Sequence, residues 1–178
     1  MADQPTWRDF LPLDDEALFA QCEFDRFRAS GPGGQKRNVT ESAVRLRHGP
    51  SGLAAVATES RSQHENRARA LRRLRTTLAL TLRSPVALEA YAPPNKLAEA
   101  LTSGFGRRDK RFLPAIAALF DLLAAVEWRV SDAARRLKVS TAALGRLLER
   151  EGVVLKAANE RRVALGMRPL KARKTTRR

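Results

Sequence analysis

The residues with the clearest chemical potential are Gly33, Gly34 and Gln35, followed by Lys36 and Arg37. Glycine reaches backbone angles closed to other residues and lets the main chain approach a ligand closely. Gln35 cannot serve as a general base, because a neutral amide has no useful proton affinity near neutral pH. It can position a water molecule, and the backbone N–H groups beside it can stabilise developing negative charge. A glycine loop that presents one amide ahead of two cations suits a polyanionic pocket.

Further motifs follow this loop in order: the segment 38–48, the turn 50–52 and the segment 59–66. Together, from about Phe24 to Leu82, they closely resemble the peptidyl-tRNA hydrolysis domain of class I peptide chain release factors. The same domain occurs in the codon-independent ribosome-rescue hydrolases. The resemblance covers under half of the chain, and it is specific because several motifs occur at the family's spacing.

This resemblance implies hydrolysis of the ester that joins a nascent peptide to tRNA. In the family, the loop inserts into the peptidyl-transferase centre, where ribosomal RNA and the tRNA's own terminal hydroxyl complete the site. Gly33 and Gly34 then meet steric and conformational requirements, and Gln35 is the positioning residue. The implied partners are the ribosome and peptidyl-tRNA, with no cofactor. The family's glutamine is commonly N-methylated, so a glutamine methyltransferase is a candidate partner acting on Gln35.

The chain also departs from the family. Pro32 stands where alanine is common, and Lys36 and Arg37 stand where the codon-reading factors carry less basic residues. The chain has no room for the stop-codon-recognition domain, and it contains no recognisable codon-reading tripeptide. We therefore expect ribosome rescue without codon recognition. Whether the stalled complex carries a truncated mRNA or is a separated large subunit stays open.

Other functions remain as alternatives. The loop could anchor a non-hydrolytic ribosome-binding or RNA-binding protein. A helix-turn-helix in the second half could belong to a nucleic-acid regulator, and a true termination factor would depend on a stop codon. Membrane binding is the weakest of them, because no apolar anchor accompanies the basic residues.

Charge favours a polyanionic partner. The net charge is +15 and the pI is about 11.4. Residues 1–84 hold 14 lysines and arginines against 10 acidic residues, whereas residues 85–178 hold 20 against 9. An excess of this size is typical of proteins that bind nucleic acid. The predicted RNA-binding residues are Arg28, Lys36, Arg37, Arg61, Arg67, Lys171, Arg173, Lys174, Arg177 and Arg178.

Composition also bears on the compartment. No apolar run approaches the roughly 20 residues that span a bilayer, and the N-terminus lacks the features of a signal peptide. Cys22 is the single cysteine, so no internal disulfide can form, which suits a reducing cytoplasm. Its expected role is that of a small buried side chain. No His/Cys cluster has metal-ligand spacing, so no metal is expected.

The sequence pattern of the first half predicts a small domain with a mixed sheet and one packed helix. We expect an extended segment over 1–12, a helix over 14–23, a strand over 24–28 and a hairpin over 44–58. His48 is expected at a strand edge, without a catalytic role. Ser62 and Glu65 form a capping box that starts a helix near Gln63. Leucines at 71, 74, 78 and 82 of this helix are expected to face the sheet. Five arginines with few acidic residues nearby lie on the other faces of the helix: Arg67, Arg69, Arg72, Arg73 and Arg75.

The second half predicts helices over 96–101, 113–126, 131–148 (as helix, turn, helix) and 155–165. The helix-turn-helix pattern is degenerate, so a helical bundle without a specific ligand stays equally open. The fold class is therefore α+β, with a hydrolysis domain at 1–84, a linker at 85–95, a helix-turn-helix-like helical domain at 96–166 and a basic tail at 167–178. We expect a cytoplasmic monomer.

Overall fold

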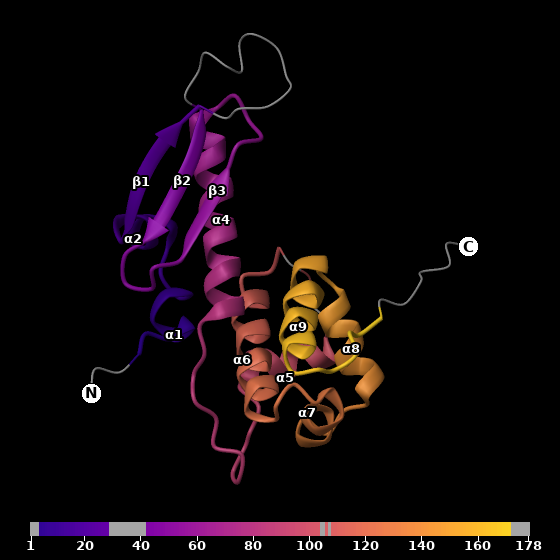
Figure 1. The fold of residues 1–178 in the computed structure, drawn as a ribbon. Coiled ribbons are helices and arrows are strands. Elements are labelled where there is room, and N and C mark those ends of the chain that lie inside the picture. The colour runs from indigo at the N-terminus through magenta and orange to yellow at the C-terminus, as the bar shows by residue number, and fades with distance from the viewer. Residues whose placement is uncertain (1–3, 29–41, 104–105, 107, 172–178) are drawn as a thin grey trace. The chain divides into compact units, whose positions relative to one another are not determined.

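The computed structural model describes residues 4–28, 42–103, 106 and 108–171 (Figure 1). Contacts between residues divide the chain into two compact units, Met1–Leu82 and Arg83–Arg178. Within the described ranges, no helix combines the length and the apolar character needed to cross a membrane. The predicted linker, helical domain and tail, which divide the second half more finely, stay predictions.

The first unit begins with two short helices, α1 (Trp7–Phe10) and α2 (Asp15–Ala20). The predicted extended segment over 1–12 is wrong where α1 forms. Thr6 accepts a hydrogen bond from the backbone of Arg8, and its own N–H donates to the Asp9 carboxylate at 2.8 Å. This reciprocal cap, together with burial of the aromatic residues at both ends of α1, stabilises a single helical turn.

Three strands form one sheet in the order β1–β2–β3: Cys22–Phe27, Ala43–His48 and Ala54–Ala57. Both strand pairs are antiparallel, so the described sheet is not mixed as predicted. For β2 and β3 the reason is local, because the tight turn after His48 returns the chain directly beside β2. The predicted hairpin is confirmed.

Helix α4 (Gln63–Thr81) packs on β2 and β3 (Figure 1). The hydroxyl of Ser62 accepts from the backbone N–H of Glu65, which confirms the predicted start of the helix. The predicted leucines at 71, 74 and 78 are buried. Leu82 lies beyond the helix in extended backbone and is only half-buried, so the stripe of buried leucines ends at Leu78.

His48 ends the central strand and is fully buried, which corrects its predicted place at a strand edge. One ring nitrogen lies 2.7 Å from the Ser51 hydroxyl and the other 3.0 Å from Oε1 of Gln21. The ring packs edge-on against Phe10, with centroids 4.5 Å apart. Burial lowers the pKa of His48, so the neutral ring is favoured in the fold.

The described residues of the second unit form helices only. They are α5 (Asn95–Thr102), α6 (Phe112–Ala125), α7 (Val130–Arg136), α8 (Thr141–Glu149) and α9 (Gly152–Ala164). Helix α6 contributes more buried residues to the core than any other helix of this unit, since nearly all of its side chains are buried. Each predicted helix of this half has a counterpart here, with boundaries shifted by a few residues.

Candidate functional site

The glycine loop is framed by two paired strands. Gly33, Gly34 and Gln35 lie outside the described residues, as do Lys36 and Arg37. Phe27 ends β1 and pairs with Ala43, which begins β2. The segment that carries the predicted catalytic residues therefore leaves and re-enters the sheet through neighbouring strands.

Asn66 holds the returning end of that segment. Its side chain is fully buried on the first turn of α4. Nδ2 donates to the carbonyl oxygens of Ser42 at 2.6 Å and Ser60 at 2.8 Å, and Oδ1 accepts from the N–H of Ser60 at 2.9 Å. Three bonds from one amide fix the base of the loop segment against the start of α4.

Sequence reasoning gave Asn66 no role, although a signal was present. Asn66, Ala70, Leu74 and Leu78 follow one another at intervals of four, and all four are buried. A polar residue on an otherwise apolar helical stripe indicates a buried side chain that requires hydrogen-bond partners.

The predicted RNA-binding residues fall in different places. Arg28 and Arg61 are exposed, one just beyond β1 and the other just before Ser62. The bonds of Asn66 to Ser42 and Ser60, together with the pairing of Phe27 with Ala43, bring both arginines to the same end of the sheet, beside the start of α4. Lys171 is exposed in the second unit. The predicted residues outside the described ranges are Lys36, Arg37, Arg173, Lys174, Arg177 and Arg178.

Arg67 is half-buried, and its guanidinium lies 3.6 Å from the centre of the Phe19 ring. A guanidinium stacked on an aromatic face keeps its charge while its position becomes fixed. Arg67 thus presents an oriented cation on α4, beside α2.

The other arginines of α4 have more acidic neighbours than predicted. Arg73 hydrogen-bonds to Glu59, and that bond lowers the pKa of the Glu59 carboxyl. Arg75 lies 2.9 Å from Asp15, and Arg69 lies 3.5 Å from Glu65. These carboxylates come largely from other segments, so α4 has fewer arginines without an acidic partner than the sequence predicted.

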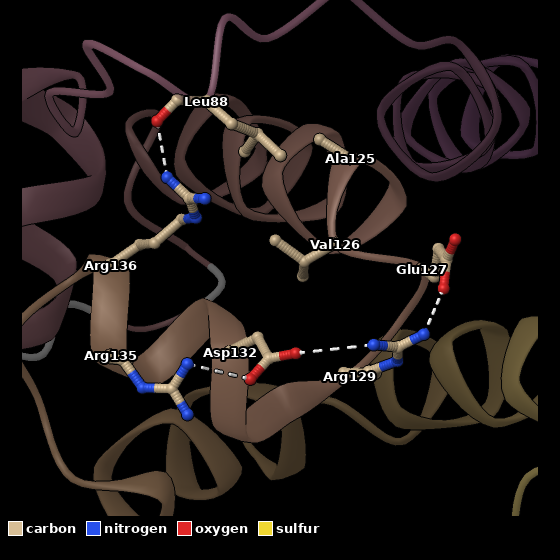
Figure 2. A pocket seen from close by; sticks show the side chains of 8 residues that line it. All are labelled: Leu88, Ala125, Val126, Glu127, Arg129, Asp132, Arg135 and Arg136. Atoms are coloured by element: carbon tan, nitrogen blue, oxygen red, sulfur yellow. Dashed lines mark hydrogen bonds and ion pairs between the residues drawn. The ribbon is translucent and has the colours of Figure 1, made fainter.

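The second unit contains a polar pocket of about 510 Å³ (Figure 2). Asp132 lies between Arg135 at 3.3 Å and Arg129 at 4.0 Å, and Arg129 also pairs with Glu127. Arg136 donates to the carbonyl oxygen of Leu88. The eight lining residues supply charge and include no serine, cysteine or histidine: Leu88, Ala125, Val126, Glu127, Arg129, Asp132, Arg135 and Arg136.

Comparison with known proteins supports the predicted family. The RF-1 domain family matches residues 17–110. Peptide chain release factor 1 of Acidiphilium cryptum is 52% identical over 66 residues, which are 37% of this chain and 19% of that protein. Peptide chain release factor 2 of Paramagnetospirillum magneticum is also 52% identical over 66 residues, covering 37% and 18%.

Peptide chain release factor 1 of Chlamydia felis is 47% identical over 68 residues, covering 36% of this chain and 19% of that protein. The match thus spans about a fifth of the length of these curated relatives. The family match is longer than these alignments, and it includes β1 to β3, α4 and the residues that Asn66 joins. Since it takes in more than half of the chain, the protein belongs to the class I peptide chain release factor family.

Proposed function

We propose that this protein hydrolyses the peptidyl-tRNA ester in the ribosomal peptidyl-transferase centre without reading a codon. The observation that carries the proposal is the Gly33-Gly34-Gln35 sequence, placed between two paired strands whose junction Asn66 fixes. Membership of the release factor family supports this chemistry. The expected partners are the large-subunit ribosomal RNA and peptidyl-tRNA, and the expected place of action is the cytoplasm.

In the proposed reaction, a water oxygen bonds to the ester carbonyl carbon. The bond from that carbon to the terminal ribose oxygen of the tRNA then breaks, and the leaving oxygen gains a proton while the water loses one. Gln35 positions the water, and backbone N–H groups near Gly34 stabilise the developing negative charge. Arg28 and Arg61, with Lys36 and Arg37, neutralise RNA phosphates around the loop.

Codon independence is part of the proposal. It rests on the concentration of charge in residues 85–178. We propose that those cations supply the affinity for a stalled ribosome that codon recognition supplies elsewhere. N-methylation of Gln35 would increase the contact of its side chain with the ribosomal pocket. Mass spectrometry of the native protein would show whether this methyl group is present.

The test is peptide release from purified ribosomes that hold peptidyl-tRNA in the P site. Wild type, Gly34→Ala and Gln35→Ala are compared on truncated, stop-codon and intact sense templates and on separated large subunits. We expect release on the truncated template or the separated subunit, reduced about a hundredfold by Gly34→Ala. Gln4→Ala, at an exposed glutamine, is the matched control and should release at the wild-type rate.

Two outcomes would overturn the proposal. Release that requires the stop codon would make the protein a termination factor. Ribosome binding with no release on any template or subunit would make the loop an anchor in a non-hydrolytic ribosome-binding protein.

A further inference from the structure

Helices α7 and α8 are joined in a fixed orientation. Lys138 lies in the connecting turn with φ of +53°, a left-handed conformation that reverses the chain sharply. The N–H of Val139 donates to the carbonyl oxygen of Ala134 at 3.0 Å, and the hydroxyl of Ser140 caps α8 by accepting from the N–H of Ala143. The two helices therefore form a defined helix-turn-helix (Figure 1).

One face of α8 points inward. Leu144, Leu147 and Leu148 are fully or almost fully buried and hold the helix against the rest of the second unit. The opposite face carries Ala142 and Arg146, which are exposed. These two residues are four positions apart and thus lie on the same side of the helix.

Gly145 on α8 is half-buried, and its backbone conformation does not require glycine. A Cβ added there would meet nothing nearer than a carboxylate oxygen of Glu149 at 4.0 Å. Glycine inside a helix lowers stability relative to alanine. Its presence together with Ala142 leaves the helix backbone open to close approach by a partner.

The same helix-turn-helix is rich in cations. They come from the last turn of α7, the connecting turn, the outward face of α8 and the residue that follows it: Arg135, Arg136, Lys138, Arg146 and Arg150. In the described part of the chain, no carboxylate forms an ion pair with Lys138 or Arg146. The outward side of α8 therefore combines a small residue with a cation that has no ion pair within the described ranges, and a second such cation, Lys138, lies in the turn before it.

We propose that this face of α7 and α8 binds the sugar–phosphate backbone across the minor groove of double-helical RNA. That groove is wide and shallow and displays ribose hydroxyls, so small side chains can rest against it while flanking cations reach the phosphates. Residues 129–151 contain no asparagine or glutamine, the side chains that pair with adenine in a DNA major groove. The choice of RNA rests on the proposed function, which places the protein on the ribosome.

The test measures binding of the full-length protein to RNA duplexes of about 20 base pairs in two unrelated sequences, and to a DNA duplex of equal length. Arg146→Ala combined with Lys138→Ala should weaken RNA binding at least tenfold and reduce the salt dependence of the affinity. Gly145→Leu should weaken it similarly, and its melting temperature is measured alongside to show that the fold accommodates the larger side chain, since the site has room for a Cβ. Lys156→Ala combined with Arg161→Ala on α9 removes the same charge and should change affinity less than twofold.

Each contrary result is distinct. An equal loss of affinity in the α9 control would show that net charge alone drives binding, and this would overturn the proposal. Wild-type affinity in Gly145→Leu would exclude the close contact, and a DNA duplex bound as tightly as RNA would exclude the choice of partner. Gln35→Ala should bind RNA normally, so a failure of peptide hydrolysis is separable from a failure of this proposal.

Discussion

Asn66 on α4 donates a 2.6 Å hydrogen bond to the carbonyl oxygen of Ser42, 24 residues earlier in the chain. Ser42 is the residue just before β2, at the end of the segment that contains the glycine loop. Because Asn66 is also bonded twice to Ser60, the amide connects the loop's exit, the approach to α4 and the helix itself. The position of the loop is thus coupled to the packing of α4 on the sheet.

We predict that Asn66→Ala lowers the free energy of unfolding by about 3 kcal/mol, because it leaves buried backbone groups of Ser42 and Ser60 unpaired. Asn66→Asp should cost more, since its carboxylate would face two carbonyl oxygens. Denaturant unfolding measures both changes. His64→Ala, at an exposed position on the same turn, should remain within about 0.5 kcal/mol of wild type.

A positioning role for Asn66 requires a second comparison. Leu78→Ala removes a fully buried side chain from the same helix and should destabilise it by about 3 kcal/mol. At a temperature where both variants are folded, Asn66→Ala should release peptide more slowly than Leu78→Ala. Equal release rates would contradict the positioning role and leave Asn66 as a purely structural residue.

His48 makes the stability of the first unit depend on pH. Burial lowers its pKa in the folded state, so between that pKa and about 6.5 the unfolded chain binds more protons than the folded chain. Stability therefore rises with pH through this window, is fully present above about pH 6.5 and is lost as the pH falls. Melting temperatures measured across the window should show this slope.

The chain contains only one other histidine, which provides the control. His64 is exposed at the start of α4, so His64→Gln should keep the slope. His48→Gln should lower stability at all pH values and flatten the slope. An unchanged slope in His48→Gln would assign the pH dependence to other groups.

Local sequence signals predicted most of the elements. The Ser62 cap and the four-residue spacing of leucines located α4, and the turn chemistry after His48 located the hairpin. These features depend on neighbours within about four residues, which a sequence displays directly. The short helix α1 escaped prediction because a single turn lacks a repeating pattern, and its stability depends on burying Trp7 and Phe10.

Contacts between distant segments could not be predicted. His48 is buried because Gln21, 27 residues away, accepts its hydrogen bond. The arginines of α4 seemed to lack acidic partners because those partners are distant in the sequence. Asp15 is 60 residues from Arg75, and Glu59 is 14 residues from Arg73. The frame of the candidate site therefore required the fold, whereas the residues expected to do chemistry were evident in the loop itself.

Arg75 anchors the N-terminal segment to α4. Its guanidinium donates to the carbonyl oxygens of Leu11 at 3.3 Å and Leu13 at 2.7 Å and to the Asp15 carboxylate at 2.9 Å. Arg75→Lys should lower the free energy of unfolding by about 2 kcal/mol, because one ammonium group cannot span all three acceptors. Arg72→Lys, on an exposed face of the same helix, should have little effect.

Fluorescence can follow this change in the first unit alone. The chain has two tryptophans, and Trp7 lies in α1, whereas Trp128 lies in the second unit. In a Trp128→Phe background, Trp7 reports unfolding of the segment that Arg75 anchors. If Arg75→Lys and Arg72→Lys unfold at the same denaturant concentration, the three hydrogen bonds contribute nothing measurable to stability.

Asp121 is the corresponding buried charge in the second unit. It is 3% exposed on α6, and it accepts hydrogen bonds from Arg83 at 3.2 Å and from the N–H of Ser84 at 3.0 Å. Burial lowers the pKa of Arg83 to about 10, but Asp121 opposes this effect and the guanidinium stays charged at neutral pH. The pair fixes the start of the second unit to its central helix.

We predict that Asp121→Asn lowers the free energy of unfolding by about 3 kcal/mol, because Arg83 then keeps a half-buried charge without its counter-ion. Trp128, whose ring centroid lies 5.2 Å from that of Phe120 beside Asp121, reports the transition in a Trp7→Phe background.

Asp109→Asn is the matched control. The pKa of Asp109 is lowered to about 2 by hydrogen bonds from Arg111, but this pair is at the surface, so solvent should screen its loss. Equal shifts in the two variants would mean that burial adds nothing to the Arg83–Asp121 interaction.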